Sequence, residues 1–291
     1  MPESLRNLRS RVRKIRSTIK ITRAMSMVAA AKQRRALAVF RASRPYAEKL
    51  QALVARVAAS LPEEFAHPLF EEREEQRLLM VLFSGDRGLA GAFNSRIIGR
   101  TERFLRERGK ERCALYCIGR RGRDYFRRRG WRIVEEVLEL RGRADVEIAR
   151  RVAADLQARF VRRETDAIYL AYNGVLSMTT YQERIEKFLP LAPEALRGGD
   201  REVAGVQYII EPSLEEVFAQ LLPRYAEARL YATMAETLTA EHSARMVAMS
   251  GATRNCEDLI QSLTLRMNKA RQDSITRQIL EIVGGAEALR S

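Results

Sequence analysis

Apolar side chains near both ends of the chain recur at alternating steps of three and four residues. A period of 3.5 residues is the seam of a coiled coil. At the amino end the series is Leu5, Leu8, Val12, Ile15 and Ile19, with Thr22 and Ser26 in the next positions. Toward the carboxyl end it is Met246, Met249, Thr253, Cys256, Ile260, Leu263, Met267 and Ala270. We therefore predict long helices over 1–61 and 213–291, paired with each other as an antiparallel two-helix coiled coil.

The middle of the chain has a different pattern. Short apolar runs at 78–83, 113–118 and 166–172 are typical of buried strands. Weaker strand candidates lie at 131–134, 177–190 and 206–210, and helices are expected at 94–108, 120–129 and 145–163. Strands that alternate with helices indicate an α/β layer domain. We expect a Rossmann-like α/β domain over 76–205, inserted between the two halves of the coiled coil.

Charge adds a partner to this picture. The chain has 291 residues with a net charge of +15, and before Pro45 its many arginines and lysines are opposed only by Glu3. Such a balance points to an anionic partner. The arginines spread around the helix and no aromatic residue precedes Phe40, so neither base stacking nor membrane anchoring is favoured. Nucleic acid, an anionic membrane surface and an acidic protein surface all stay open on these grounds.

Candidate chemistry is sparse. The loop Ser84 to Gly91 follows a strand, yet its glycines do not match the dinucleotide pattern and no Walker sequence exists. Asp86 with Arg87, or Glu135 with Glu136, lack an accompanying nucleophile and histidine. The two histidines, His67 and His242, are far apart in sequence and match no metal-ligand spacing. We expect no catalytic residue, no cofactor and no metal.

Location follows from what the chain lacks. No apolar run approaches the roughly 20 residues of a membrane span, and the amino terminus has no apolar signal core. Cys113 and Cys117 would lie about 13 Å apart in a strand, too far for a disulfide. A reduced, cytoplasmic protein is expected.

Several sequence motifs resemble one family. Residues 19–32 (IKITRAMSMVAAAK) closely resemble the amino-terminal signature of the gamma subunit of F-type ATP synthases. Segments 244–249, 252–255, 268–276 and 281–287 are similar to the carboxyl-terminal part of the same family, and 86–94 (DRGLAGAFN) to its globular-domain motif. The likeness covers nearly the whole chain, although Asp273 stands where the family commonly has alanine.

The resemblance implies a non-catalytic rotor shaft. Its partners would be the alpha and beta subunits of the catalytic ring, the epsilon subunit and the membrane c-ring, with one copy per complex and no homo-oligomer. Nucleotide chemistry would belong to the beta subunits. The complex would hold the chain peripherally at the cytoplasmic face of a bacterial cell membrane, without nucleic acid. The alternative is a basic coiled-coil protein that binds nucleic acid.

The resemblance also implies interface positions. Arg23, Met25 and Lys32 match the region that faces acidic loops of the beta subunits, and Arg245 matches a position near Met25 that braces the two helices. Further along, Arg271, Gln272 and Thr276 match positions that grip loops of the ring. Ile279, Ile282 and Val283 should form an apolar tip that turns in its bearing.

Overall fold

The computed structural model describes residues 5–59, 67–140, 142–191 and 213–288. They fall into two compact units. The paired-helix unit contains residues 5–28 and 246–288, and the α/β unit contains Ala29–Arg245. Two helices contribute to both units, α1 (Leu5–Ala59) and α6 (Leu214–Ala288). The strand expected at 206–210 lies outside the described residues.

In the paired-helix unit, α1 and α6 pack along the predicted seam. Leu8 and Val12 of α1 are buried with Leu263 of α6, and Ile15, Ile260 and Met267 pack around them. Further along α1, the Thr22 hydroxyl hydrogen-bonds that of Thr253 at 2.7 Å, and Ser26 pairs with Ser250 at 2.9 Å. Because rising α1 numbers meet falling α6 numbers, the pair is antiparallel. The coiled-coil prediction is confirmed here.

The α/β unit is built on a five-stranded sheet in the order β3-β2-β1-β4-β5. The first four strands are parallel and β5 runs antiparallel to β4. The strands are β1 (Leu78–Phe83), β2 (Cys113–Ile118), β3 (Ile133–Val137), β4 (Ala167–Val175) and β5 (Tyr181–Leu189). The third strand therefore begins and ends later in the chain than the 131–134 expected from the sequence. The strand expected near 177–190 is β5, at one edge of the sheet.

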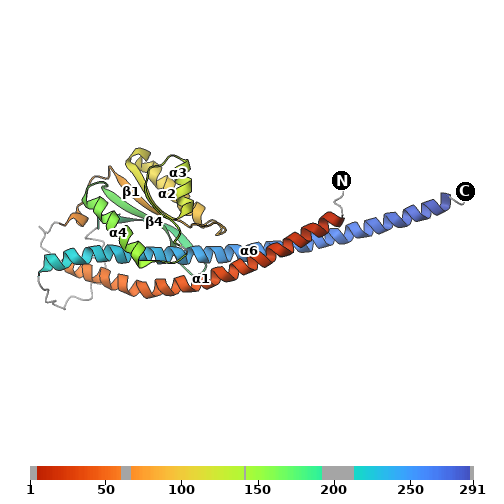
Figure 1. Cartoon of the computed structure of the whole chain (residues 1–291), viewed down its shortest axis with the longest axis horizontal. Coiled ribbons are helices and arrows are strands. Elements are labelled where there is room, and N and C mark those ends of the chain that lie inside the picture. The colour runs from red at the N-terminus through yellow and green to blue at the C-terminus, as the bar shows by residue number, and fades with distance from the viewer. Residues whose placement is uncertain (1–4, 60–66, 141, 192–212, 289–291) are drawn as a thin grey trace. The chain divides into compact units, whose positions relative to one another are not determined.

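Helices cover both faces of this sheet, as a Rossmann-like domain requires. They are α2 (Phe93–Arg108), α3 (Arg120–Arg128) and α4 (Val146–Val161), with short 3-10 turns at Pro68–Phe70 and Lys110–Arg112. Successive side chains of a strand point to opposite faces. Leu78, Met80 and Leu82 accordingly pack under α2 and α3, whereas Leu79, Val81 and Phe83 join α4. Figure 1 shows α2 and α3 on one side of the sheet and α4 on the other.

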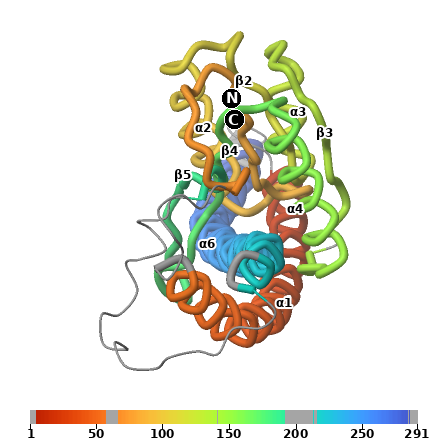
Figure 2. Tube along the Cα trace, turned by 90° about the vertical axis from the view of Figure 1, so that its left-hand side faces the viewer, coloured from red at the N-terminus to blue at the C-terminus, as the bar shows by residue number. Residues whose placement is uncertain are grey.

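The α4 face of the sheet also packs against the long helices. Leu50 and Val54 of α1 and Phe218 and Leu222 of α6 are buried in the same apolar cluster as α4. In Figure 2 the first turns of α6, in turquoise, lie beside the last turns of α1, in orange. Ser213 caps α6, since its hydroxyl accepts the Glu216 N–H at 3.1 Å. This side of the sheet is therefore bound to both helices within the α/β unit.

Candidate functional site

The carboxyl end of β1 is the place where this fold usually binds a ligand. In open parallel sheets, ligands lie at the carboxyl edge where the strand order reverses. Here β1 stands between β2 and β4, so the loop that follows it, residues 84–92, marks that point. This is also the glycine-containing loop that the sequence offered as a phosphate-binding candidate.

The polar groups of this loop are used to hold the loop itself. The Gly85 N–H donates to Asn94 Oδ1 at 2.8 Å. The Asp86 carboxylate accepts the Arg120 N–H through Oδ1 and the Leu140 N–H through Oδ2, each at 3.1 Å. Asp86 therefore ties together the segments that follow β1, β2 and β3. That arrangement supports a structural turn and gives Asp86 no role as an acid–base pair with Arg87.

A group of polar side chains on α6 reaches the loops at this edge of the sheet. We call Glu236, Glu241, His242, Ser243 and Arg245 the α6 clamp. Arg245 donates to the Gly88 carbonyl from Nη2 at 3.3 Å, Ser243 Oγ donates to the Met178 carbonyl, and Glu236 Oε1 accepts the Val175 N–H at 2.8 Å. The clamp thus holds the loops after β1 and β4.

The strongest member of the clamp is an ion pair. Arg245 Nη2 lies 2.6 Å from Glu241 Oε1, one helical turn away, and the two side chains are only 13% and 10% exposed. Low exposure strengthens the attraction, and it also makes the loss of either partner costly. The Gly85 position would place a Cβ 3.0 Å from Glu241 Oε1, so a glycine leaves room for this carboxylate. Geometry and charge therefore fix α6 against the β1–α2 loop.

His242 extends the clamp to the loop between β3 and α4. Burial lowers its pKa below the ordinary value of 6.5, so the ring is neutral near pH 7. Its Nε2 lies 3.4 Å from the Gly142 carbonyl and its Nδ1 3.4 Å from Arg245 Nη1. A carbonyl can only accept and a guanidinium can only donate. Both contacts are therefore satisfied by one tautomer, with the proton on Nε2.

Burial also changes the acidity of Glu236. Its carboxyl has a pKa raised above the ordinary 4.5, chiefly by desolvation, while the Val175 N–H and Arg184 oppose that effect. Arg184 Nη1 lies 3.9 Å away. Glu236 is thus a partly buried acid held by one short hydrogen bond and one distant cation.

The site residues expected from the sequence occupy separate places. Arg23 is exposed and ion-paired with Glu257 within the paired-helix unit, beside the half-buried Met25. Lys32 is exposed on α1 in the α/β unit. The described contacts of Arg245 are those of the α6 clamp, whereas the sequence assigned it to a brace near Met25. That bracing role stays a prediction.

The carboxyl-terminal candidates lie together on exposed turns of α6. Arg271, Gln272 and Thr276 are exposed and make no ion pair or side-chain hydrogen bond within the part of the chain that the structure describes. Exposed apolar side chains follow at Ile275, Ile279, Leu280, Ile282 and Val283, where exposure runs from 44% to 72%. A gathering of large apolar side chains in water is typical of an interaction surface.

The clamp residues other than Arg245 were missed from the sequence. One signal was available, because Glu241 and Arg245 stand four apart on a predicted helix, as ion pairs do. Their partners on loops come from far away in the sequence, so local patterns could not reveal the contacts.

Over the described ranges, no group of three or more His, Cys, Asp or Glu side chains could hold a metal ion. None of the described helices is long and apolar enough to cross a membrane.

Comparisons with known proteins identify the family. A family model described as ATP synthase matches residues 4–289. The ATP synthase gamma chain of Pelotomaculum thermopropionicum is 40% identical over 286 residues, covering 98% of this chain and 99% of the relative. That of Moorella thermoacetica is 42% identical over 288 residues, covering 98% and 99%.

The solved structures agree on the fold. A chain of the Euglena gracilis mitochondrial ATP synthase rotor superimposes with a TM-score of 0.64 at 18% identity, covering 93% of this chain and 98% of that chain. The family model and the near full-length relatives show that the chain belongs to the ATP synthase gamma chain family.

Proposed function

We propose that this chain is the central rotor shaft, the gamma subunit, of a membrane F-type ATP synthase. In that role it couples ion flow through a c-ring to ATP synthesis or hydrolysis on beta subunits and performs no chemistry itself. Its partners are the alpha and beta subunits of the ring, the epsilon subunit and the c-ring. Membership of the gamma chain family supports this role.

One structural observation carries the mechanical part of the proposal. The single helix α6, Leu214–Ala288, contains both the clamp to the α/β unit and the exposed turns around residues 271–283. A shaft must pass torque from the part that is driven to the part that meets the catalytic ring. Between the clamp and residue 283, α6 contains no proline, so its backbone hydrogen-bond ladder resists twisting over that stretch. The clamp prevents the α/β unit from slipping around the helix. Together these features suit transmission of torque.

The interface assignments follow from exposure and charge. Arg271, Gln272 and Thr276 have no side-chain partner among the described residues and can bind loops of the ring, and Ile279, Ile282 and Val283 offer the apolar surface of a bearing. Arg23 and Lys32 are exposed cations for acidic loops of the beta subunits, with Met25 between them in sequence. Because Arg23 already pairs with Glu257, its contact would exchange one exposed ion pair for another, at low cost.

The division of labour follows the three predicted segments. We assign 1–61 and 213–291 to the shaft and 76–205 to the α/β domain that meets epsilon and the c-ring. The chain has one copy per complex. It lies at the cytoplasmic face of the bacterial cell membrane as a peripheral subunit, held there through the complex.

Co-purification tests this function. The tagged chain is expressed together with the alpha, beta and epsilon genes of its own genome, and the purified complex is assayed for ATPase activity. We expect a stoichiometric assembly with one copy of this chain, and little turnover from the chain alone. Salt-sensitive DNA binding by the isolated chain, with no assembly, would instead support the nucleic-acid alternative and refute the rotor.

A further inference from the structure

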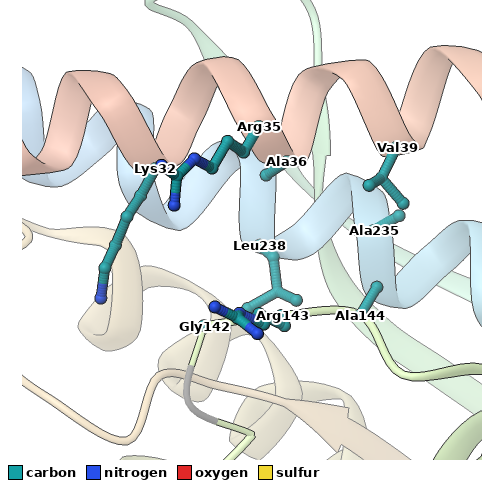
Figure 3. Close-up of a pocket in the computed structure, with 9 residues that line it drawn as sticks. All are labelled: Lys32, Arg35, Ala36, Val39, Gly142, Arg143, Ala144, Ala235 and Leu238. Carbon is teal, nitrogen blue, oxygen red and sulfur yellow. The ribbon is translucent and has the colours of Figure 1, made fainter.

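A cavity of about 540 Å³ lies in the α/β unit between α1, α6 and the loop that joins β3 to α4. Its size falls within the range of roughly 300 to 1,000 Å³ that is usual for small-molecule sites. The lining comprises Lys32, Arg35, Ala36 and Val39 of α1, Gly142, Arg143 and Ala144 of the loop, and Ala235 and Leu238 of α6. Figure 3 shows these side chains around the space between the two helices and the loop.

The charged side chains among the described lining residues are all positive. Three of these residues, Lys32, Arg35 and Arg143, are cations, and none of the described residues that line the cavity is acidic. Within the described residues, none of the three makes an ion pair or a side-chain hydrogen bond. Many other arginines of this unit are paired, as Arg150 is with Glu147 at 2.8 Å. The cavity therefore gathers three cations whose side chains have no acidic partner in the described part of the chain.

The rest of the lining is apolar. Val39, Ala235 and Leu238 present aliphatic groups, and Ala36 and Ala144 are small enough to leave the space open. His242 packs behind Gly142 and its neutral ring adds no charge to this part of the lining. A lining that combines cations with aliphatic groups matches a ligand with an anionic head and an apolar body. Arginine binds phosphate and carboxylate through two parallel N–H groups, which favours such a head group.

We propose that this cavity binds a small amphiphilic anion, with a phosphate or carboxylate head held by Lys32, Arg35 and Arg143. The apolar body of the ligand lies against Val39, Ala235 and Leu238. A bound ligand bridges α1, α6 and the β3–α4 loop inside the α/β unit, and so stabilises their packing. This site does not depend on the rotor function, although it shares Lys32 with the proposed contact to the beta subunits, so Arg35 and Arg143 are the cations that belong to the site alone.

Calorimetric titration of the full chain with 1-naphthyl phosphate tests the proposal. We expect saturable one-site binding that raises the unfolding temperature. 1-Naphthol lacks the charge and inorganic phosphate lacks the apolar body, so each should bind about tenfold or more weakly. Equal affinity for inorganic phosphate would contradict an amphiphilic site and overturn the proposal.

Matched variants locate the site. The double substitution Arg35→Gln with Arg143→Gln should weaken naphthyl phosphate binding about tenfold or more, because the charge-assisted hydrogen bonds from both guanidinium groups to the head group are lost. Arg41→Gln is the control, since Arg41 is exposed on the same helix but does not line the cavity. Its affinity should stay within about twofold of the parent. An equal loss in the control would show diffuse surface charge and refute the site.

A cavity-filling variant tests whether binding requires the space inside the cavity or only the cations around it. Ala36→Trp keeps all three cations and occupies the space where the apolar body would lie. Binding of naphthyl phosphate should disappear while the far-ultraviolet circular dichroism stays at the parental level. Binding that survives in a folded Ala36→Trp chain would overturn the proposal. If this variant does not fold, the glutamine variants still decide.

Discussion

At the scale of single residues, the pair of Arg245 and Glu241 dominates the contact between α6 and the β1–α2 loop. Both side chains are nearly buried, and Arg245 also donates to the Gly88 carbonyl. A buried pair owes little net stability to its mutual attraction, because both charges lost their hydration on folding. The pair matters because each buried charge is compensated by the other, so the loss of one leaves the other without compensation. The pair lies within α6, so Glu241 holds the Arg245 guanidinium in the place from which it donates to the loop.

Replacing Arg245 with glutamine should expose that requirement. The variant leaves the Glu241 carboxylate buried without its cation, which should lower the free energy of unfolding by about 3 kcal/mol. Chemical denaturation followed by circular dichroism measures the change. Arg254→Gln is the control, an exposed arginine on the same helix without an ion pair among the described residues, and should stay within about 0.5 kcal/mol. Equal stability of the Arg245 variant and this control would disprove the clamp's contribution.

Glu236 gives the molecule a pH dependence of known sign. Burial raises the pKa of its carboxyl above 4.5, so the folded state binds the proton more tightly than the unfolded chain does. Stability from this group is therefore present below pH 4.5 and is lost as pH rises through the raised pKa. Arg184 and Arg44 reduce the effect and Glu186 adds to it.

Glu236→Gln should remove that dependence. The amide oxygen can still accept the Val175 N–H, and no charge is buried at neutral pH. We expect the variant to be more stable than the parent at pH 7 and equal to it near pH 4. Denaturant midpoints at the two pH values provide the comparison. A variant less stable than the parent at pH 7 would mean that the distant Arg184 contact outweighs desolvation.

At the scale of elements, the coiled-coil seam depends on a few buried positions. Leu263 is 1% exposed and packs on Leu8 and Val12, whereas Leu265, two residues on, is 71% exposed. Leu263→Ala should therefore lower the free energy of unfolding by roughly 2 to 4 kcal/mol through lost burial and a new cavity. Leu265→Ala makes the same chemical change on the exposed side and should cost little. The loss of helical circular dichroism on heating distinguishes them, and similar curves would place the seam elsewhere.

Sequence patterns predicted the elements because their causes are local. The seam follows from a spacing that a single helix sets, and β1 and β2 follow from runs buried on both sides. The prediction began the third strand too early, at Trp131, because this residue is buried by packing against a helix and not by strand pairing. Its ring packs edge-on against Phe126, with ring centroids 5.7 Å apart, and pairing with β2 begins at Ile133. An apolar residue in the sequence predicts burial. Which residues pair in a sheet depends on the neighbouring strand, which the local sequence does not specify.

The α6 clamp illustrates the opposite case. Glu236, Glu241 and His242 are polar residues within a long helix, and from sequence they read as solvated surface. The partner of Glu236 is Val175, 61 residues away, that of His242 is Gly142, 100 residues away, and that of the neighbouring Arg245 is Gly88, 157 residues away. Such contacts depend on where the fold places loops, which no local period encodes. The interface residues predicted from 271 to 283 rest instead on resemblance to the family.

At the scale of the whole molecule, a shaft that performs no chemistry can affect catalysis only through contacts with the ring. Arg271 and Gln272 are exposed on α6 and have no internal partner among the described residues, so the chain's own fold does not need them. Their replacement should leave folding and assembly intact. Any change in the turnover number would then be due to an altered contact with the ring, because kcat and assembly are measured separately.

The double variant Arg271→Ala with Gln272→Ala should lower the ATPase rate of the assembled complex several-fold, because charge-assisted hydrogen bonds to the ring are lost. Arg266→Ala is the matched control, an exposed arginine earlier on the same helix, and should keep the parental rate. Both complexes must co-purify with equal subunit content. Unchanged turnover and coupling in the double variant would refute the grip, and the remaining candidate for meeting the ring would be the exposed apolar turn at Ile279, Ile282 and Val283.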